Sequence, residues 1–190
     1  MKNKIFKIFG IILFAQVFLY ACCGGKEEYN IFISSITLST LDATGSNPST
    51  VTNEDFRLFI DTNFDSELVT SLVQKSGFIN TANAVTCLDY YNVINPVTNI
   101  NVEANVPLFD VPAGESLNNY IFVAYMFDTN SFGLMSDLIS ELNDERNDTT
   151  SAFLKFNTVI PIDTSVIFKI TLTLENGEQF ESSATEVTFE

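Results

Sequence analysis

Apolar and polar residues alternate most regularly in the last quarter of the chain. Every second residue from Val166 to Leu174 is apolar, and from Phe168 onward Lys or Thr occupies each position between them. A period of two places these apolar side chains on one face of an extended backbone. The pattern therefore predicts a strand with one buried face.

A turn signal and a second strand signal follow that strand. Asn176-Gly177 predicts a type I′ hairpin turn, because both central residues of such a turn need a positive φ. Phe180 opens the expected return strand. Val187 and Phe189 predict one further short strand at the C-terminal end.

Weaker period-two patterns predict strands in the rest of the chain. Ile31 and Ile33 share one parity, whereas Ile36 and Leu38 share the other, so we expect a bulge near residues 34–35. The other expected strands are residues 56–61 with Phe56, Leu58 and Ile60 on one face, 82–88, 97–102 with Thr98, Ile100 and Val102 on one face, and 120–127, which is apolar on both parities and is predicted to be buried on both faces.

Polar segments separate these strands. Residues 41–53 are rich in Gly, Ser, Thr, Asn and Pro and predict a loop, and residues 110–115 predict a turn. Residues 65–74 have both helical and strand features, so the sequence does not decide between a helix and a strand there.

One helix is expected after residue 130. Its apolar face consists of Leu134, Leu138, Ile139 and Leu142, and its polar face of Asp137, Glu141 and Asp144. Asn130 or Ser131 is the expected N-cap, and the helix is expected to end in the polar stretch 143–150.

Together these elements predict a mainly β fold. Several short strands with turns between them are typical of an antiparallel β-sandwich, here of immunoglobulin-like size, with the single α-helix as an insertion. We expect residues 31–190 to form one such domain.

The first 21 residues have the features of an export signal. Lys2, Lys4 and Lys7 form a basic start, and residues 8–21 are apolar except for Gln16. This run is shorter than the about 20 residues that a membrane-spanning helix needs. We therefore predict a signal peptide over residues 1–21.

Charge and composition narrow the classes of function. Three of the nine basic residues precede residue 22, so the mature chain carries six basic and 24 acidic side chains, a net charge of −18. Such a charge argues against nucleic acid and against a binding face for anionic lipid. The chain has no His, which excludes Ser-His-Asp and Cys-His catalysis and imidazole zinc sites. We expect no enzyme.

Leu19-Tyr20-Ala21-Cys22 resembles the lipobox of bacterial lipoproteins. The resemblance implies cleavage before Cys22 and attachment of fatty acyl chains such as palmitate to it, which would anchor the chain in a membrane. The alternatives are an ordinary secretory signal and an anchor that stays attached. Residues 22–30 would then be a polar tether.

Three stretches resemble an uncharacterised family of Bacteroidota lipoproteins built on a domain of unknown function. They are ACC at 21–23, NAVTCLD at 83–89, and VTNINV at 97–102 with FDVPAGESLNN at 109–119. The resemblance implies a cell-envelope location, and it offers no activity because the family has none assigned. Lys26-Glu27-Glu28 resembles the export signal of surface-exposed lipoproteins of that phylum, which implies the outer membrane. Asp148-Thr149-Thr150, expected in a loop, resembles an O-glycosylation acceptor of its envelope proteins.

Cys23 and Cys87 are the thiols that remain after lipidation of Cys22. An exported protein meets an oxidising compartment, which favours a disulfide between them. The alternative is that Cys87 is a small buried residue and Cys23 is free.

Asp61, Asn63 and Asp65 have the D-x-N-x-D spacing of some calcium loops. An EF-hand also needs Gly at its sixth position and Glu at its twelfth, where this chain has Ser66 and Leu72. A simpler calcium site and a polar turn after a strand are the two interpretations left open.

Asp89, Tyr90 and Tyr91 place an acidic side chain beside two rings. Rings beside a carboxylate can stack on a sugar, which suggests a glycan site. Half-buried packing of the tyrosines is the alternative.

These observations predict a lipid-anchored, non-enzymatic envelope protein with an interaction or structural role and an envelope protein or glycan as partner. The alternative is a surface module that binds carbohydrate or calcium.

Overall fold

The computed structural model describes residues 27–71, 90–125, 128–144 and 149–190. By its internal contacts the chain divides into two units, which we describe separately. Unit 1 contributes described residues 27–30, 66–71 and 90–92, and unit 2 comprises residues 31–65 and the described part of 93–190. The expectation of one domain over 31–190 stays a prediction.

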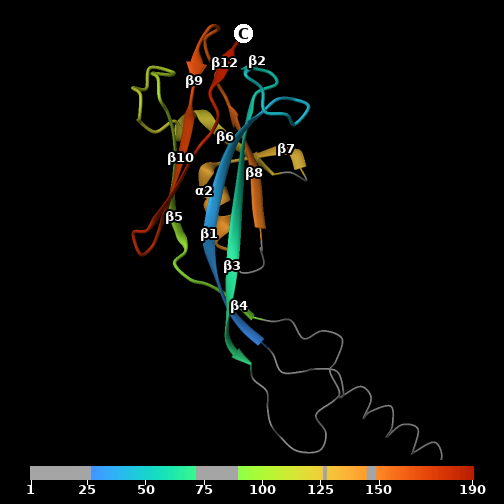
Figure 1. The fold of residues 1–190 in the computed structure, drawn as a ribbon, viewed down its shortest axis with the longest axis vertical. Helices are drawn as coiled ribbons and strands as arrows, with labels where there is room; N and C mark the ends of the chain where they lie inside the picture. The colour runs from blue at the N-terminus through green and yellow to red at the C-terminus, as the bar shows by residue number, and fades with distance from the viewer. Residues whose placement is uncertain (1–26, 72–89, 126–127, 145–148) are drawn as a thin grey trace, which may run out of the picture. The chain divides into compact units, whose positions relative to one another are not determined.

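The fold is mainly β and sandwich-like, which confirms the expected fold class (Figure 1). The described strands form three sheets, with the orders β4-β1-β3-β8-β6-β7, β11-β10-β5 and β2-β12-β9. The elements are β1 Glu27–Leu41, β2 Thr50–Val51, β3 Arg57–Ser71, β4 Tyr90–Val93, β5 Val97–Ala104, η1 Asn118–Tyr120, β6 Ile121–Tyr125, β7 Asp128–Gly133, α2 Met135–Leu142, β8 Thr149–Phe156, β9 Ser165–Val166, β10 Phe168–Leu174, β11 Gln179–Ser183 and β12 Val187–Phe189. The pair β2–β12 is parallel, in contrast to the antiparallel pairing expected throughout.

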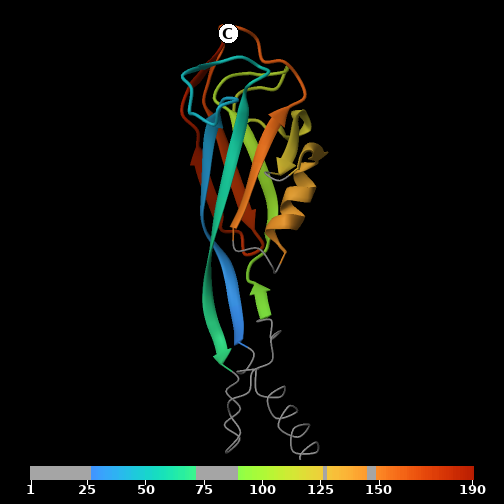
Figure 2. The ribbon, with the colours of Figure 1, turned by 90° about the vertical axis from the view of Figure 1, so that its right-hand side faces the viewer.

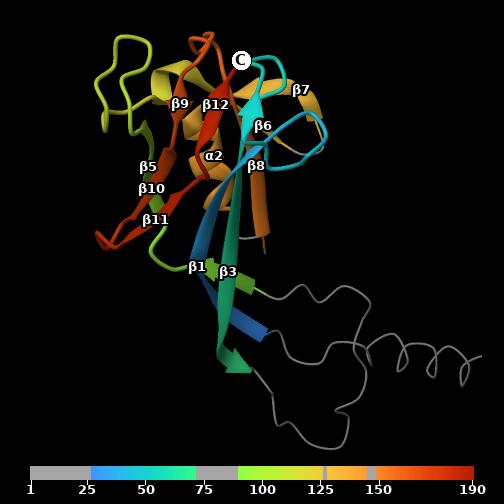
Figure 3. The same cartoon turned by 45° about the horizontal axis from the view of Figure 1, so that its top comes forward.

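Strand β10 is the centre of its sheet, between β5 and β11 (Figure 3). Its side chains alternate between buried and half-buried, as the sequence predicts, and Phe168, Ile170 and Leu172 are fully buried. The β10–β11 turn is not type I′. In this turn Gly177 alone has a positive φ, of 85°, and its amide donates to the carbonyl of Leu174. The turn is thus a three-residue hairpin loop with glycine in the left-handed position.

Strand β5 confirms the strand expected at 97–102 but corrects the position of Thr98. The register with β10 shifts between Thr173 and Leu174, so Thr98 is an extra residue without a direct partner. Thr98 is exposed and its hydroxyl donates to the carbonyl of Thr173, while Val97 takes the buried position.

Strand β1 changes parity where the sequence predicts it. Ile31 and Ile33 are buried, and so are Ile36 and Leu38 beyond the change. The Ser34 hydroxyl at this point donates to the carbonyl of Asn63 on β3.

Strand β3 is longer than the sequence predicts. It continues through residues 61–65, where it pairs with β8 from Asp61↔Ser151 to Asn63↔Thr149, and it ends at Ser71. The interpretation of residues 61–65 as a turn is therefore wrong. Strand β8 was not predicted, and Thr149 belongs to it and not to the expected loop.

Strand β6 corrects the expectation of burial on both faces. It begins at Ile121, after the 3₁₀ turn η1. Ile121 and Val123 are buried, but Phe122 between them is 38% exposed. Ala124 is buried on the outward side.

The expected helix is present as α2, with a different start. Asn130 and Ser131 lie in β7, so neither is the N-cap. The amide of Leu134 donates to the Asp137 carboxylate at 2.7 Å, and a Cβ at Gly133 would lie 2.8 Å from that carboxylate. Leu134, which the sequence pattern places on the apolar face, is exposed. Met135 lies on the buried face of the helix instead.

Helix α2 packs against β5, β6, β7 and β8. Its last turn is joined to β5 by the side chain of Asn143, which accepts from the amide of Val97 at 2.8 Å and donates to the carbonyl of Val97 at 2.9 Å. Within the described ranges no helix is both long and apolar enough to cross a membrane.

The strand pairings of unit 2 bring three loops to one end of it (Figure 2). We call this the loop end and define it as residues 42–56, 105–117 and 157–164. Residues 42–56 connect the end of β1 to the start of β3. The other ends of these two strands within unit 2, at Ile31 and Asp65, therefore lie opposite the loop end.

Candidate binding site at the loop end

Several residues singled out in the sequence lie outside the described residues. They are Cys22, Cys23, Cys87 and Asp89, together with residues 82–88. Lipidation of Cys22 and the bond between Cys23 and Cys87 stay predictions.

Asp61, Asn63 and Asp65 share one face of strand β3. At about 3.3 Å per residue, the two aspartates lie about 13 Å apart along the strand, too far to bind one ion at 2.3–2.6 Å. The Asp61 carboxylate accepts a hydrogen bond from the Ser151 hydroxyl at 2.7 Å, and the Asn63 amide donates to the Ser35 hydroxyl. This geometry disfavours calcium at these three residues.

Tyr90 and Tyr91 belong to unit 1. The ring of Tyr91 stacks on Tyr29 with centroids 5.5 Å apart and an interplanar angle of 19°. Asn92, the next residue, donates to the Glu28 carboxylate at 2.8 Å. One face of Tyr91 is therefore used in packing, while Tyr90 is exposed.

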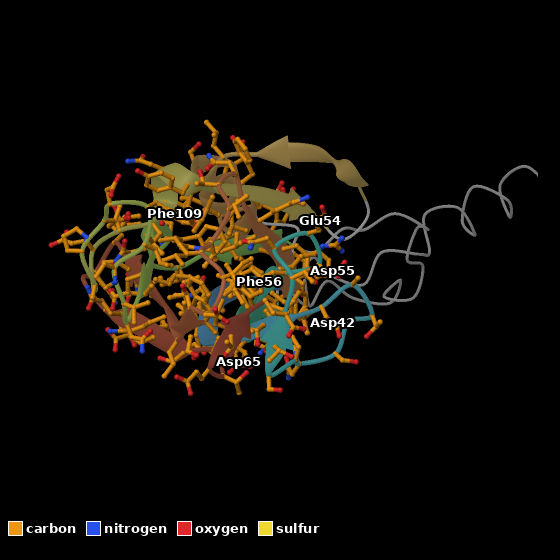
Figure 4. The ribbon with its side chains drawn as sticks, turned by 90° about the horizontal axis from the view of Figure 1, so that it is seen from above. Asp42, Glu54, Asp55, Phe56, Asp65 and Phe109 are labelled. Carbon is orange, nitrogen blue, oxygen red and sulfur yellow. The ribbon has the colours of Figure 1, made fainter. Side chains whose placement is uncertain are left out.

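A cluster of rings lies beneath the loop end in unit 2. Phe56 is at its centre, 4.8 Å from the ring of Phe189, 5.5 Å from Phe168 and 6.1 Å from Phe156. Phe109 extends the cluster from the second loop, because its ring lies 5.6 Å from Phe156. Figure 4 looks onto the loop end, with Phe56 toward the middle of the unit and Glu54 and Asp55 toward its rim.

An open pocket of about 200 Å³ lies above one side of this cluster. Its floor includes Phe56 and Phe156, and its walls come from the first and third loops and the end of β8. The complete lining is Asn53, Glu54, Phe56, Lys155, Phe156, Asn157, Thr158, Val159 and Ile160.

Asn53 joins the two loops that wall the pocket. Its side-chain amide donates to the carbonyl of Ile160 at 2.9 Å, and its carbonyl oxygen accepts from the amide of Ile160 at 2.6 Å. Ile160 is itself buried. Two hydrogen bonds from one side chain and a buried anchor fix the separation of the two walls, so the pocket is formed without a ligand.

Glu54 and Lys155 are the charged residues of the pocket lining. In the part of the chain that the structure describes, neither forms an ion pair with the other or with a third residue. The neighbouring Asp55 carboxylate accepts a hydrogen bond from the Thr52 hydroxyl at 3.0 Å. Glu54 and Lys155 are therefore opposite charges that remain available to a ligand.

Exposed apolar side chains stand beside the pocket on the third loop. Val159 and Ile162 are 71% and 66% exposed, on either side of buried Ile160 and exposed Pro161. The loop is tied down at its far end, where the amide of Asp163 donates to the carbonyl of Phe189. Val159 and Ile162 are therefore exposed apolar side chains on a loop that is anchored at Ile160 and Asp163.

Displaced pKa values occur away from the pocket. Hydrogen bonds from the Thr44 hydroxyl and the Ser46 amide lower the pKa of the Asp42 carboxyl. A hydrogen bond with Glu181 raises the pKa of Lys169, and the same bond lowers the pKa of Glu181. Each shift follows from local contacts that organise a loop or a strand pair.

The sequence did not reveal this pocket, although it contained a signal for it. Residues 159–162 read Val-Ile-Pro-Ile, an apolar segment that is interrupted by proline and followed by Asp-Thr. An apolar segment that is too short for a strand suggests a loop with a contact surface. No protein-family model matches the chain, and no curated protein matches it either.

Proposed function

We propose that the chain is a lipoprotein of the cell envelope, anchored through Cys22, that acts by binding and not by catalysis. Its leader and lipobox-like residues 19–22 support the anchor, and residues 26–28 support the outer membrane and surface exposure. Its partner would be an envelope protein, a glycan or a small molecule bound at the loop end.

One observation carries the binding role. The chain enters unit 2 at Ile31, which lies at the end opposite the loops, so that about ten residues of β1 separate the tether side from the loop end. At about 3.3 Å per residue this is roughly 33 Å. The pocket and exposed Val159 and Ile162 belong to the loop end, away from the place where an anchored tether would join the unit.

Adjacent cysteines allow a matched test of the anchor. The full chain is expressed in a Bacteroidota host that is fed an alkyne-labelled palmitate, as wild type, Cys22→Ala and Cys23→Ala. We expect label in the wild type and in Cys23→Ala and none in Cys22→Ala. Equal label in both variants, or none in the wild type, would refute anchoring at Cys22.

Surface exposure has a separate test. Intact cells are treated with a protease, and the full chain is followed by blotting, with a periplasmic protein as the control. We expect cleavage of this chain while the control stays intact, and less cleavage when Lys26, Glu27 and Glu28 are all replaced by Ser. Full protection in the wild type would place the chain on the inner side.

A further inference from the structure

The pocket at the loop end combines three kinds of side chain in a small volume. Glu54 supplies a negative charge and Lys155 a positive charge, and half-buried Phe156 and exposed Val159 supply the apolar surface above buried Phe56. In the described part of the chain the two charged residues line one pocket and form no ion pair with each other.

We propose that this pocket binds a zwitterionic amino acid with an apolar side chain. The ammonium group of the ligand would bind the Glu54 carboxylate, and its carboxylate would bind the Lys155 ammonium. Its side chain would lie against Phe156 and Val159. The inference rests on the proposed function in so far as it takes the loop end as the binding end.

The size of the pocket supports a ligand of this class. Pockets for drug-sized ligands have volumes of roughly 300–1,000 Å³. At about 200 Å³ the present pocket suits a smaller molecule, and its open side leaves room for the two charged ends.

The charge of the protein supports a zwitterion over an anion. The mature chain carries a net charge of −18, which repels anions and attracts cations over the whole surface. A zwitterion has no net charge to be repelled. Specificity then comes from the two local charges, since each makes a charge-assisted hydrogen bond with its counterpart.

The pocket also needs little rearrangement to bind. The two hydrogen bonds between Asn53 and Ile160 hold its walls. On the floor the rings of Phe56 and Phe156 are nearly parallel, with an interplanar angle of 16°. A preformed site loses less conformational entropy on binding.

The test uses the full chain, purified in detergent, and titration calorimetry with L-leucine as the probe. 4-Methylpentanoate lacks the ammonium group, isoamylamine lacks the carboxylate, and glycine is a zwitterion without an apolar side chain. We expect L-leucine to bind at least roughly tenfold more tightly than each of the three, because each lacks one contact. Absence of L-leucine binding, or equal binding of any of the three, would overturn the proposal.

Variants test the two charged residues. Glu54→Gln and Lys155→Gln are each expected to weaken L-leucine binding by roughly tenfold or more. Glu178→Gln and Lys169→Gln make the same changes of net charge away from the pocket and are expected to leave binding unchanged. If the pocket variants and their controls weaken L-leucine binding equally, net charge alone governs binding and the proposal is overturned. Labelling at Cys22 is independent of this result, so failure here leaves the anchor proposal separately testable.

Discussion

Strands β10 and β3 are both buried on one face, yet their sequences differ greatly. In β10 every inward side chain is apolar, and the sequence predicts its end at Leu174, although Val166 belongs to the separate strand β9. The inward series of β3 is Leu58, Ile60, Thr62 and partly buried Phe64, so a hydroxyl interrupts it, and most residues after Ile60 are polar. β3 nevertheless continues as a strand to Ser71.

The difference shows two ways of making a strand. The apolar face of β10 stabilises it through burial, which depends on its own residues. From Asp61 to Asn63 the polar part of β3 is held by backbone pairing with β8, a strand about 90 residues later in the chain, and on its other side β3 neighbours β1. One consequence is the Thr62 hydroxyl, which is fully buried and has no hydrogen-bond partner in the described structure.

The largest expected effect tests the apolar strand. Phe168→Ala removes a fully buried ring that lies 5.5 Å from Phe56 and 5.4 Å from Phe156. We expect the free energy of unfolding to fall by about 3–5 kcal/mol, measured by chemical denaturation. Phe180→Ala, on the neighbouring strand, removes a half-buried ring and should have a clearly smaller effect. Equal losses would mean that burial does not explain the stability of β10.

A medium effect of opposite sign tests the polar strand. Thr62→Val replaces the unpartnered hydroxyl by a methyl group of similar size, so stability should rise by about 1–2 kcal/mol in the same measurement.

Thr40 is the matched control for Thr62. Thr40 is also fully buried, but its hydroxyl is 3.1 Å from that of Thr185. Thr40→Val breaks this hydrogen bond and should lower stability by about 1 kcal/mol. Changes of the same sign in both variants would show that the partner of the hydroxyl does not matter.

The smallest effect lies on the outward face of β10. Lys169 pairs with Glu181 at 2.9 Å and with Glu103 at 3.5 Å, all near the surface. The pKa of Lys169 is raised above 10.5, so its contribution to stability is present below pH 10.5 and is lost as the pH rises through the folded-state pKa. The pKa of Glu181 is lowered below 4.5, so its contribution is present above pH 4.5 and is lost as the pH falls through the folded-state pKa.

Denaturation midpoints of wild type and Lys169→Gln check this dependence. We expect a small difference near neutral pH that disappears in strong acid and in strong base, and that shrinks with added salt. A difference that is constant from about pH 3 to about pH 11 would contradict the pairing.

The fold class, the C-terminal strands and α2 could be predicted from the sequence, because their apolar residues repeat with a regular period. The helix start could not. Asn130 and Ser131 are good capping residues, but they belong to β7, and Asp137 caps the helix instead, from inside its first turn. The turn at Asn176-Gly177 was placed correctly but its type was wrong, since one positive φ at Gly177 is enough.

The pocket could not be predicted because its parts are distant in sequence. Asn53 and Ile160 are 107 residues apart and meet because β3 pairs with β8. Glu54 and Lys155 are also about 100 residues apart in the sequence. They line one pocket only after the strands are paired.

The sequence by itself determined which strands have an apolar face, because a period of two places those side chains on one side whatever the neighbours are. It also contains the lipobox-like residues 19–22, on which the proposed anchor depends. Tertiary structure alone decided how far β3 extends, where β8 lies and which loops meet. The physical reason is that backbone amides and carbonyls need partners, and distant segments such as β8 and Asn53 supply them.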